Sequence, residues 1–309
     1  MQVEEELAKF TPPRESVLTI GVFDGVHLGH QHLIGYLKRQ ALARDYIPGV
    51  VTFREHPIQV IAPQTKLLRL TSLEERTRLL RELGIELVVP LSFAPELAQL
   101  PARDFVTLLQ KRLKMQGLVV GPDFALGRNR EGDAFALRSL GKENGFWVDV
   151  VAPKVIKGEV VSSTSIRQAL AQGDMSKVKH LLGHSYTLVG QVGRGAERGR
   201  RLGFPTANLE VNAGQALPSD GVYATRAYLA NHAYPSVTNI GTRPTFGKGE
   251  RTVEIYLLGF EGDLYGQELR VELVERLRAE RCFSGPEELR AQIGQDVKRA
   301  RSLLDKVEG

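Results

Sequence analysis

The first half of the chain alternates short apolar runs with longer segments in which apolar side chains recur every three or four residues. Short apolar runs bounded by glycine or polar residues are typical of buried strands, and the wider spacing is typical of helices. Their alternation predicts βαβ units, in which helices cover a parallel sheet. The expected strands are 17–23, 49–53, 85–91, 117–121 and 147–151, and the expected helices are 31–44, 73–83, 102–114 and 137–144.

The pattern changes after about residue 184. Apolar and polar positions now alternate in short runs separated by Gly, Pro and Asn, which favours an all-β barrel or sandwich. A final charged segment, 285–307, carries apolar residues on one helical face. The expected strands are 186–192, 222–229, 233–240, 252–258 and 269–276. We therefore expect an α/β domain over 1–183 and an all-β domain over 184–309, with the boundary in or just after a helix at 175–182.

Composition narrows the class of protein. With 309 residues, 42% of them apolar, the chain is long enough for two domains with cores of their own. No apolar run approaches the ~18 residues of a transmembrane helix, and the acidic start at 1–6 does not resemble a secretory signal. Cys282 is the single cysteine, so no internal disulfide forms and we expect the reducing cytoplasm. A net charge of +5 suits anionic ligands but is modest for a nucleic-acid binder.

Two histidines, His27 and His30, stand three residues apart where the first strand meets a helix. Residues three apart on a helical turn lie on one side, and a helix N-terminus offers free N–H groups to a phosphate. Gly21, Gly25 and Gly29 would let the backbone approach a bulky anion. A glycine-rich turn with incidental histidines is the alternative interpretation. A zinc site is disfavoured, because no obvious Cys or His complement lies nearby in the sequence.

A second polar element lies at 162–167, where hydroxyl side chains and Arg167 precede an apolar helical pattern. Hydroxyl residues commonly cap helices, so an ordinary N-cap explains the segment by itself. The arginine adds a forked donor that suits a triphosphate. Taken with His27 and His30, the segment favours a phosphate-binding site.

The segment 190–208 is rich in glycine and arginine and ends in Phe204-Pro205-Thr206-Ala207-Asn208. A mobile basic loop for nucleic acid is one interpretation, but aromatic residues do not alternate with the arginines as such a loop would require. Further along, Glu254 lies on an expected strand, where an exposed glutamate is the ordinary outcome. Neither segment indicates a function by composition alone.

Read together, these segments resemble two known families. The string 21–30, with its His-Leu-Gly-His end, and the Ser-Ser-Thr-x-x-Arg element resemble the HxGH nucleotidyltransferase superfamily, in particular the FMN adenylyltransferase module of prokaryotic bifunctional FAD synthetases. The segments 52–57 and 121–127 are similar to further motifs of that module, with Glu55 and Leu126 departing from its pattern. The segments 203–208, 221–224, 239–247 and 253–266 are similar to riboflavin kinases, with Gly259 in place of the usual aspartate, and 281–284 is a weaker match.

The resemblance extends from about residue 16 to about residue 301 and implies a bifunctional enzyme. A doubly wound nucleotidyltransferase domain would precede a six-stranded β-barrel kinase with a C-terminal helix. The implied reactions are phosphorylation of riboflavin to FMN, and adenylylation of FMN to FAD with release of pyrophosphate. Both use ATP with Mg²⁺, so the expected partners are small molecules and neither nucleic acid nor a membrane.

The resemblance also implies roles for particular residues. The catalytic set is His27, His30 and Arg167 at the ATP phosphates and Glu254 as the general base of the kinase. Mg²⁺ would be held by Thr206 and Asn208. Nucleotide contacts are expected from Gly21, Phe23, Asp24, Gly29, Ser163 and Thr164 in the first domain and from Gly203, Pro205, Thr206 and Asn208 in the second. Flavin contacts are expected from His56, Pro57, Asp123 and Phe124.

Two alternatives remain open at the level of sequence. One is a different HxGH nucleotidyltransferase with a flavin-binding regulatory β-domain, which the intact 205–208 string and Glu254 argue against. The other is a flavin-sensing regulator built on retired catalytic domains. A retired site should have lost His27, His30, Arg167 or Glu254, and all four are present.

Overall fold

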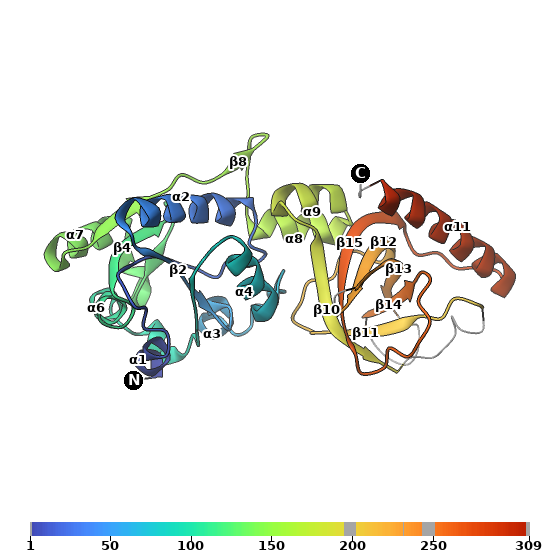
Figure 1. Cartoon of the computed structure of the whole chain (residues 1–309), viewed down its shortest axis with the longest axis horizontal. Coiled ribbons are helices and arrows are strands. Elements are labelled where there is room, and N and C mark those ends of the chain that lie inside the picture. The colour runs from blue at the N-terminus through green and yellow to red at the C-terminus, as the bar shows by residue number, and fades with distance from the viewer. Residues whose placement is uncertain (1, 195–201, 231, 243–250, 307–309) are drawn as a thin grey trace. The chain divides into compact units, whose positions relative to one another are not determined.

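A computed structural model describes residues 2–194, 202–230, 232–242 and 251–306. The chain divides into two compact units, 1–163 and 164–309 (Figure 1). Parts of two motifs, the Gly/Arg-rich stretch at 195–201 and the segment 243–247, lie outside the described residues.

The first unit is built on a five-stranded sheet in the order β3-β2-β1-β4-β7, and every neighbouring pair is parallel. The order reverses between β1 and β4, so the sheet is doubly wound, as expected. In such sheets ligands bind beyond the carboxyl ends of the strands at the point of reversal. The strands are β1 (Ser16–Ile20), β2 (Ile47–Phe53), β3 (Leu87–Leu91), β4 (Met115–Val120) and β7 (Trp147–Val150).

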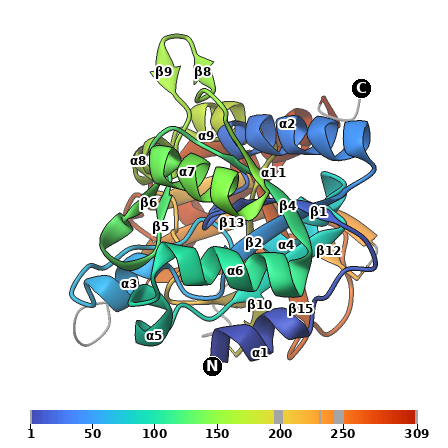
Figure 2. The same ribbon diagram turned by 90° about the vertical axis from the view of Figure 1, so that its left-hand side faces the viewer.

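Helices cover both faces of this sheet, and Figure 2 shows α2 and α6 on opposite sides of it. Val17, Val50 and Val119 face α2 and α4, whereas their neighbours along the strands face α1 and α6. Burial of both faces explains why the strands are continuously apolar instead of alternating. The helices are α1 (Gln2–Ala8), α2 (Leu28–Arg44), α3 (Pro57–Ile61), α4 (Leu73–Glu82), α5 (Pro95–Ala98), α6 (Ala102–Leu113) and α7 (Ala134–Asn144).

The first strand is shorter than the sequence pattern predicts. It ends at Ile20, because Phe23 has a φ of 53°, which no strand accommodates. The expectation of a strand to residue 23 was therefore wrong, and 21–27 is a turn. Several short elements had no periodicity to predict them: α1, α3, α5, the hairpin of β5 (Ala125–Leu126) and β6 (Gly132–Asp133) around the 3₁₀ turn η1 (Arg128–Arg130), and the hairpin of β8 (Val155–Ile156) and β9 (Glu159–Val160).

The second unit is a closed six-stranded barrel in the order β10-β11-β14-β13-β12-β15. Its ladders are antiparallel throughout, as the alternating pattern predicts. One strand, β11, was not expected, because its sequence reads first as a signature loop. The strands are β10 (Tyr186–Gly193), β11 (Ala207–Val211), β12 (Gly221–Leu229), β13 (His232–Thr242), β14 (Arg251–Leu257) and β15 (Glu268–Arg278).

A long C-terminal helix, α11 (Pro286–Asp305), covers part of the barrel's outer face. Ala300 of this helix lies in an apolar cluster with Val222, Val237 and Leu277 from three strands. The helix is also tied to β15 by an ion pair in which Arg278 Nη2 lies 2.9 Å from the buried Asp296 carboxylate. The expected C-terminal helix is thus present and seals an apolar patch on the barrel.

Two helices lie close to the division of the chain. Helix α8 (Ser163–Gln172) starts at the last residue of the first unit, and α9 (Met175–Leu182) packs against β10 and β15. The division after Ser163 precedes the boundary expected at 183/184 by these two helices. No helix within the described ranges is long and apolar enough to cross a membrane.

Candidate active sites

The turn that joins β1 to α2 has an unusual backbone. Phe23 and Val26 have φ values of 53° and 41°, and Gly25 has a φ of 82°. A non-glycine residue in the left-handed region costs about 1–3 kcal/mol and persists only when its surroundings hold it there. Val26 is β-branched and 1% exposed, so packing and hydrogen bonds must hold this turn.

Polar contacts supply that restraint. The buried Asp24 carboxylate accepts hydrogen bonds from the Leu70 N–H at 2.8 Å and the Thr71 N–H at 3.1 Å. The Thr71 hydroxyl accepts one from the Gly25 N–H at 3.0 Å, and the Ser163 hydroxyl donates to the Asp24 carbonyl at 2.9 Å. Ser163 is therefore brought to the turn, as expected, and Asp24 acts as its internal brace.

His27 and His30 are brought together at the N-terminus of α2. His27 is the N-cap residue, and its Nδ1 accepts a hydrogen bond from the His30 N–H at 3.3 Å. An accepting Nδ1 carries no proton, so the neutral His27 ring carries its proton on Nε2. The two rings stack at 3.6 Å with 16° between their planes. Gly29 permits this, because a Cβ there would lie 3.0 Å from the His27 ring and from the Val161 carbonyl.

The His30 ring is set up to receive a ligand. Its Nδ1 is buried and has no hydrogen-bond partner among the described residues. Burial holds the pKa of His30 well below its usual 6.5, and the nearby His27 and Arg76 lower it further. An unpartnered ring nitrogen beside the free N–H groups of a helix N-terminus forms a site for an anion.

The lowered pKa of His30 predicts how the first unit responds to acid. In the unfolded chain a histidine binds its proton near pH 6.5, whereas folded His30 does so only at lower pH. The stability that His30 contributes is therefore complete above about pH 6.5 and falls as the pH drops from there to the lowered pKa of folded His30, by up to about tenfold in the unfolding constant per pH unit. Urea titrations followed by the single tryptophan, Trp147 in β7, report this unit. His30→Gln should flatten the fall. The control is His32→Gln, a change at an exposed histidine. If the free energy of unfolding fell equally with pH in His30→Gln and in the wild type, the assignment would be contradicted.

One further residue that holds the turn, Arg76, was not predicted from the sequence. Arg76 of α4 is 2% exposed, and its Nη1 donates to the Val22 carbonyl and to the Thr52 hydroxyl. The Thr52 hydroxyl in turn donates to the same Val22 carbonyl at 3.0 Å. One signal was available: Arg76 stands on the face of α4 that carries Leu79 and Leu80, where an apolar residue is the rule.

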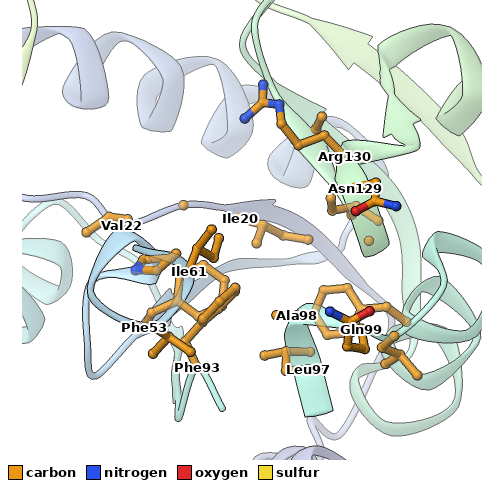
Figure 3. A pocket seen from close by; sticks show the side chains of 18 of the residues that line it. Ile20, Val22, Phe53, Ile61, Phe93, Leu97, Ala98, Gln99, Asn129 and Arg130 are labelled. Atoms are coloured by element: carbon orange, nitrogen blue, oxygen red, sulfur yellow. The ribbon is translucent and has the colours of Figure 1, made fainter. Parts of the chain in front are cut away.

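A cavity of about 800 Å³ lies beside the turn (Figure 3). Its wall is mainly aromatic and aliphatic, and Phe53 and Phe93 meet edge to face at 5.3 Å. Asn129 and Arg130 lie across the cavity from these rings. A large, mostly apolar cavity with a few polar groups suits a flat, partly polar ligand.

The four expected flavin contacts are placed differently around this cavity. Pro57 and Phe124 line it. His56 is the N-cap of α3, and its Nδ1 accepts from the Ile58 N–H at 3.2 Å. The side chain of Asp123 is exposed, while its carbonyl accepts from Arg130 Nη2 at 2.8 Å. His56 and Asp123 thus shape the loops on which the cavity walls stand.

The two departures from the family pattern have local explanations. The Glu55 carboxylate accepts from the Phe93 N–H at 3.3 Å and so ties the loop after β2 to the loop after β3. Leu126 is buried and forms part of the cavity wall, where it replaces an aromatic ring with aliphatic surface. Neither departure removes the cavity.

Thr164 and Arg167 of the expected phosphate site lie on α8 in the second unit. The histidines lie in the first unit. The contacts that these two residues make with a nucleotide stay a prediction.

The second candidate site lies on the barrel. Across three adjacent strands, Asn208 on β11 is paired with Glu254 on β14, and Glu254 is paired with Asn239 on β13. Residues directly opposite on neighbouring strands share a face and lie about 5 Å apart at Cβ. All three are half-buried while Val253 and Ile255 beside Glu254 are buried, so the row lies on the outer face. Asn239 was not an expected site residue, and its Nδ2 donates to Glu280 at 3.2 Å.

A cavity of about 620 Å³ is lined by Ala207 and Ile255, the residues next to Asn208 and Glu254 along their strands, and not by the row itself. Pro205 and Thr206 line it together with Phe260, Leu264 and Tyr265. Gly203, just upstream, has a φ of 85°, a conformation that favours glycine and turns the chain into β11. The expected residues Pro205, Thr206, Asn208 and Glu254 are therefore on adjoining segments.

Gly259, where the riboflavin kinase pattern has an aspartate, occupies a turn after β14. Its φ is 77°, and a Cβ there would meet nothing within 4 Å. Glycine therefore suits the backbone at this point, and the cavity wall resumes at the next residue, Phe260.

Two family models each match one part of the chain, and the two parts correspond closely to the two units of the structure. A family model described as FAD synthetase matches residues 9–165, and one described as riboflavin kinase matches residues 182–304. A protein from Escherichia coli strain K12 named bifunctional riboflavin kinase/FMN adenylyltransferase is 39% identical over 295 residues, which is 95% of this chain and 94% of that protein. The chain belongs to the bifunctional riboflavin kinase/FMN adenylyltransferase family.

Other members of the bifunctional riboflavin kinase/FMN adenylyltransferase family match to a similar extent. The Bacillus subtilis protein of that name is 35% identical over 96% of this chain and 93% of its own length. A crystal structure described as a macrolide-efflux protein from Streptococcus pneumoniae has a TM-score of 0.88 at 29% identity and covers 97% of both chains. The fold is therefore shared along the whole chain, and the two family models enclose the turn at 21–27 and the row at Asn208 and Glu254 respectively.

Proposed function

We propose that this bifunctional enzyme carries out one reaction in each unit. The second unit phosphorylates riboflavin with ATP to give FMN and ADP. The first unit transfers the adenylyl group of ATP to FMN, which gives FAD and pyrophosphate. The observation that carries the first assignment is the stacked His27–His30 pair at a helix N-terminus beside a ring-lined cavity. The row of Asn208 and Glu254 beside a second cavity carries the other.

In the first unit, an FMN phosphate oxygen attacks the α-phosphorus of ATP and the bond to the β-phosphate oxygen breaks. The phosphate is already an anion, so the step needs no general base. Its barrier lies in joining two anions and in charge that grows on the leaving pyrophosphate, which fixed N–H donors and cations stabilise. His27, His30, Gly29 and the N–H groups of α2 supply such donors.

Further contacts complete the proposal for adenylyl transfer, two of them from α8 in the second unit. Arg167, Ser163 and Thr164 add donors to the phosphates, and Gly21, Phe23 and Asp24 shape the turn that holds them. The isoalloxazine rings of FMN occupy the 800 Å³ cavity against Phe124 and Pro57, where His56 and Asp123 set the loops. Burial of a flat ring system among aromatic side chains is favourable.

In the second unit, the ribityl 5′-hydroxyl of riboflavin attacks the γ-phosphorus of ATP, and ADP leaves. The hydroxyl must lose its proton in this step, and the Glu254 carboxylate is the group on the row that can accept it. Pro205 and Thr206 border the cavity for the nucleotide, Gly203 turns the chain just before them, and Asn208 is paired with the base, Glu254.

Magnesium fits the donors on this face. The Thr206 hydroxyl and the Asn208 carbonyl are hard oxygen donors, which Mg²⁺ prefers together with phosphate oxygens and water. The described residues contain no cluster of three or more His, Cys, Asp or Glu that would hold a metal by itself. When bound, the ion offsets charge on the ATP phosphates.

We place the enzyme in the cytoplasm. Its use of ATP and its single, exposed cysteine are consistent with this placement.

Product analysis tests the proposed function. The full chain is incubated with riboflavin, ATP and Mg²⁺, and flavins are separated over time. We expect FMN to accumulate first and FAD to follow, with pyrophosphate formed in step with FAD. Tight flavin binding with no product would identify a regulator instead, and an adenylylated product from a non-flavin nucleotide would identify another nucleotidyltransferase.

The metal assignment predicts a defined loss in the kinase. Thr206→Ala and Asn208→Ala each remove one oxygen donor, and Mg²⁺ tolerates little departure from octahedral geometry. Kinase rates at fixed ATP should need more Mg²⁺ to reach half their maximum, while FAD formation from FMN keeps its Mg²⁺ dependence. Unchanged Mg²⁺ curves for both variants would remove these residues from the metal site.

A further inference from the structure

Arg76 is a charged side chain in a place that ordinary helix surface residues avoid. It lies in the second turn of α4 and is 2% exposed, whereas the Arg78 side chain is 40% exposed and forms ion pairs with the buried Glu75 and with the exposed Glu82. The ion pairs of the described ranges do not include Arg76. A buried cation without a paired anion is costly to fold, so its presence requires an explanation.

The hydrogen bonds of Arg76 point to the turn between β1 and α2. Its Nη1 contacts the Val22 carbonyl and the Thr52 hydroxyl, and Thr52 contacts that carbonyl as well. Val22 immediately precedes Phe23, the first of the two strained non-glycine residues. A charged donor therefore holds the main chain at the point where it leaves the strand direction.

Other contacts that hold the turn come from the segment just before the same helix. The amides of Leu70 and Thr71 hold the Asp24 carboxylate, and Ser72 is the N-cap of α4. The segment before α4 thus fixes one side of the turn, and Arg76 of α4 fixes the other. Movement of Arg76 would leave the Val22 carbonyl held by the Thr52 hydroxyl alone, and would leave the Asp24 contacts in place.

The charge of Arg76 is compensated only in part. Burial lowers the pKa of the Arg76 guanidinium, although the nearby Asp24 carboxylate opposes this, and the Arg76 charge in turn helps to lower the pKa of His30. Its Nε is a buried atom without a hydrogen-bond partner in the described part of the chain. A buried positive charge beside an anion-binding helix N-terminus is offset when a polyphosphate arrives.

We propose that Arg76 is a positioning residue of the adenylyltransferase site, which fixes the Val22 carbonyl and so the His27–His30 turn, and whose buried charge is offset by the phosphates of bound ATP. This inference rests on the proposed function of the first unit. It assigns to α4, a helix outside the signature motifs, a role in nucleotide use.

A series of substitutions separates the two roles proposed for Arg76, which are to hold the Val22 carbonyl and to supply a positive charge. Arg76→Lys keeps the charge and one donor, Arg76→Gln keeps a donor without charge, and Arg76→Met keeps approximate volume alone. Arg81→Met is the matched control, because Arg81 lies on the same helix and is exposed. All are made in the full chain, where riboflavin phosphorylation reports that the second unit is intact and the fluorescence of Trp147 reports that the first unit is folded.

We expect the three substitutions at Arg76 to reduce the rate of FAD formation from FMN to different extents. Arg76→Met should lose about a hundredfold in kcat/KM for ATP, the scale of a misplaced active-site group, with a raised KM for ATP as part of the loss. Arg76→Lys should recover most of the KM effect, and Arg76→Gln should recover part of the kcat effect but not the KM effect. ATP should also raise the unfolding midpoint, followed by Trp147, less in Arg76→Met than in Arg81→Met.

The opposing outcomes are distinct. Suppose that the wild-type chain makes FAD. If Arg76→Met then has the same kcat and KM for ATP as Arg81→Met, or if Arg76→Met is more active than Arg76→Lys, Arg76 is only a packing residue and the inference fails. If the first unit of Arg76→Met does not fold, the comparison of lysine with arginine decides: a lysine variant with unchanged KM and kcat overturns the inference. A wild-type chain that makes no FAD overturns the proposed function itself.

Discussion

Glu254→Gln should abolish FMN formation from riboflavin and leave FAD formation from FMN intact. The amide has nearly the shape of the carboxylate but does not accept the proton of the ribityl hydroxyl, so the kinase rate should fall by about 10²–10⁴-fold. Glutamine should also leave the strand pairing of Asn208, Glu254 and Asn239 undisturbed, because that pairing uses main-chain groups. Measurement of both rates on one preparation makes the unaffected reaction an internal control.

Glu268→Gln is the matched control for this variant. Glu268 is an exposed glutamate at the start of β15, elsewhere on the same barrel, and its substitution should change neither rate. If Glu254→Gln reduced both activities together, the assignment of the two reactions to separate sites would be wrong. A kinase rate equal to that of Glu268→Gln would remove Glu254 from the chemistry.

His30→Ala should impair FAD formation by about 10²-fold, the scale on which loss of one preorganised donor affects turnover. The effect should fall mainly on kcat, because the charge that His30 stabilises grows as pyrophosphate leaves. Its buried Nδ1 and its stacking on His27 also make the ring part of the wall of the site. Riboflavin phosphorylation should be unchanged.

His32→Ala provides the comparison on the same helix. His32 is exposed and lies two residues further along α2. The same substitution of histidine by alanine is therefore made on the same helix, but away from the turn at 21–27. Normal FAD synthesis by His30→Ala would exclude this ring from the phosphate site. A loss of similar size in His32→Ala would indicate damage to the helix instead of loss of a donor.

The architecture followed closely from the sequence because it depends on periodicity. Continuous valine-rich runs identify strands buried on both faces, and alternating runs identify barrel strands, so the two units were separable from pattern alone. Pattern failed where the backbone bends without a periodic signal. The residues 21–23 look like more strand, yet Phe23 turns the chain, and Ala207–Val211 looks like a motif, yet it is a strand.

The candidate sites were predictable to the extent that they consist of polar residues in recognisable strings. His27 and His30 meet as expected, and Asn208 and Glu254 share a register. The apolar cavity was not foreseen in detail, because the residues that form it come from many segments and in sequence resemble ordinary core. Arg76 was missed since its partner is a main-chain carbonyl, and no sequence pattern reveals which carbonyl a distant arginine will reach.

The short strand β11 has a consequence for how the kinase can be altered. It is five residues long, lies between β10 and β14, and is the piece that completes the barrel. Without it, β10 and β14 would each present a row of unpaired N–H and carbonyl groups, which other chains readily pair with. The segment that carries Asn208 is therefore also a guard against aggregation. Deletions or proline substitutions at 207–211 should yield insoluble protein, and only side-chain changes there can report on catalysis.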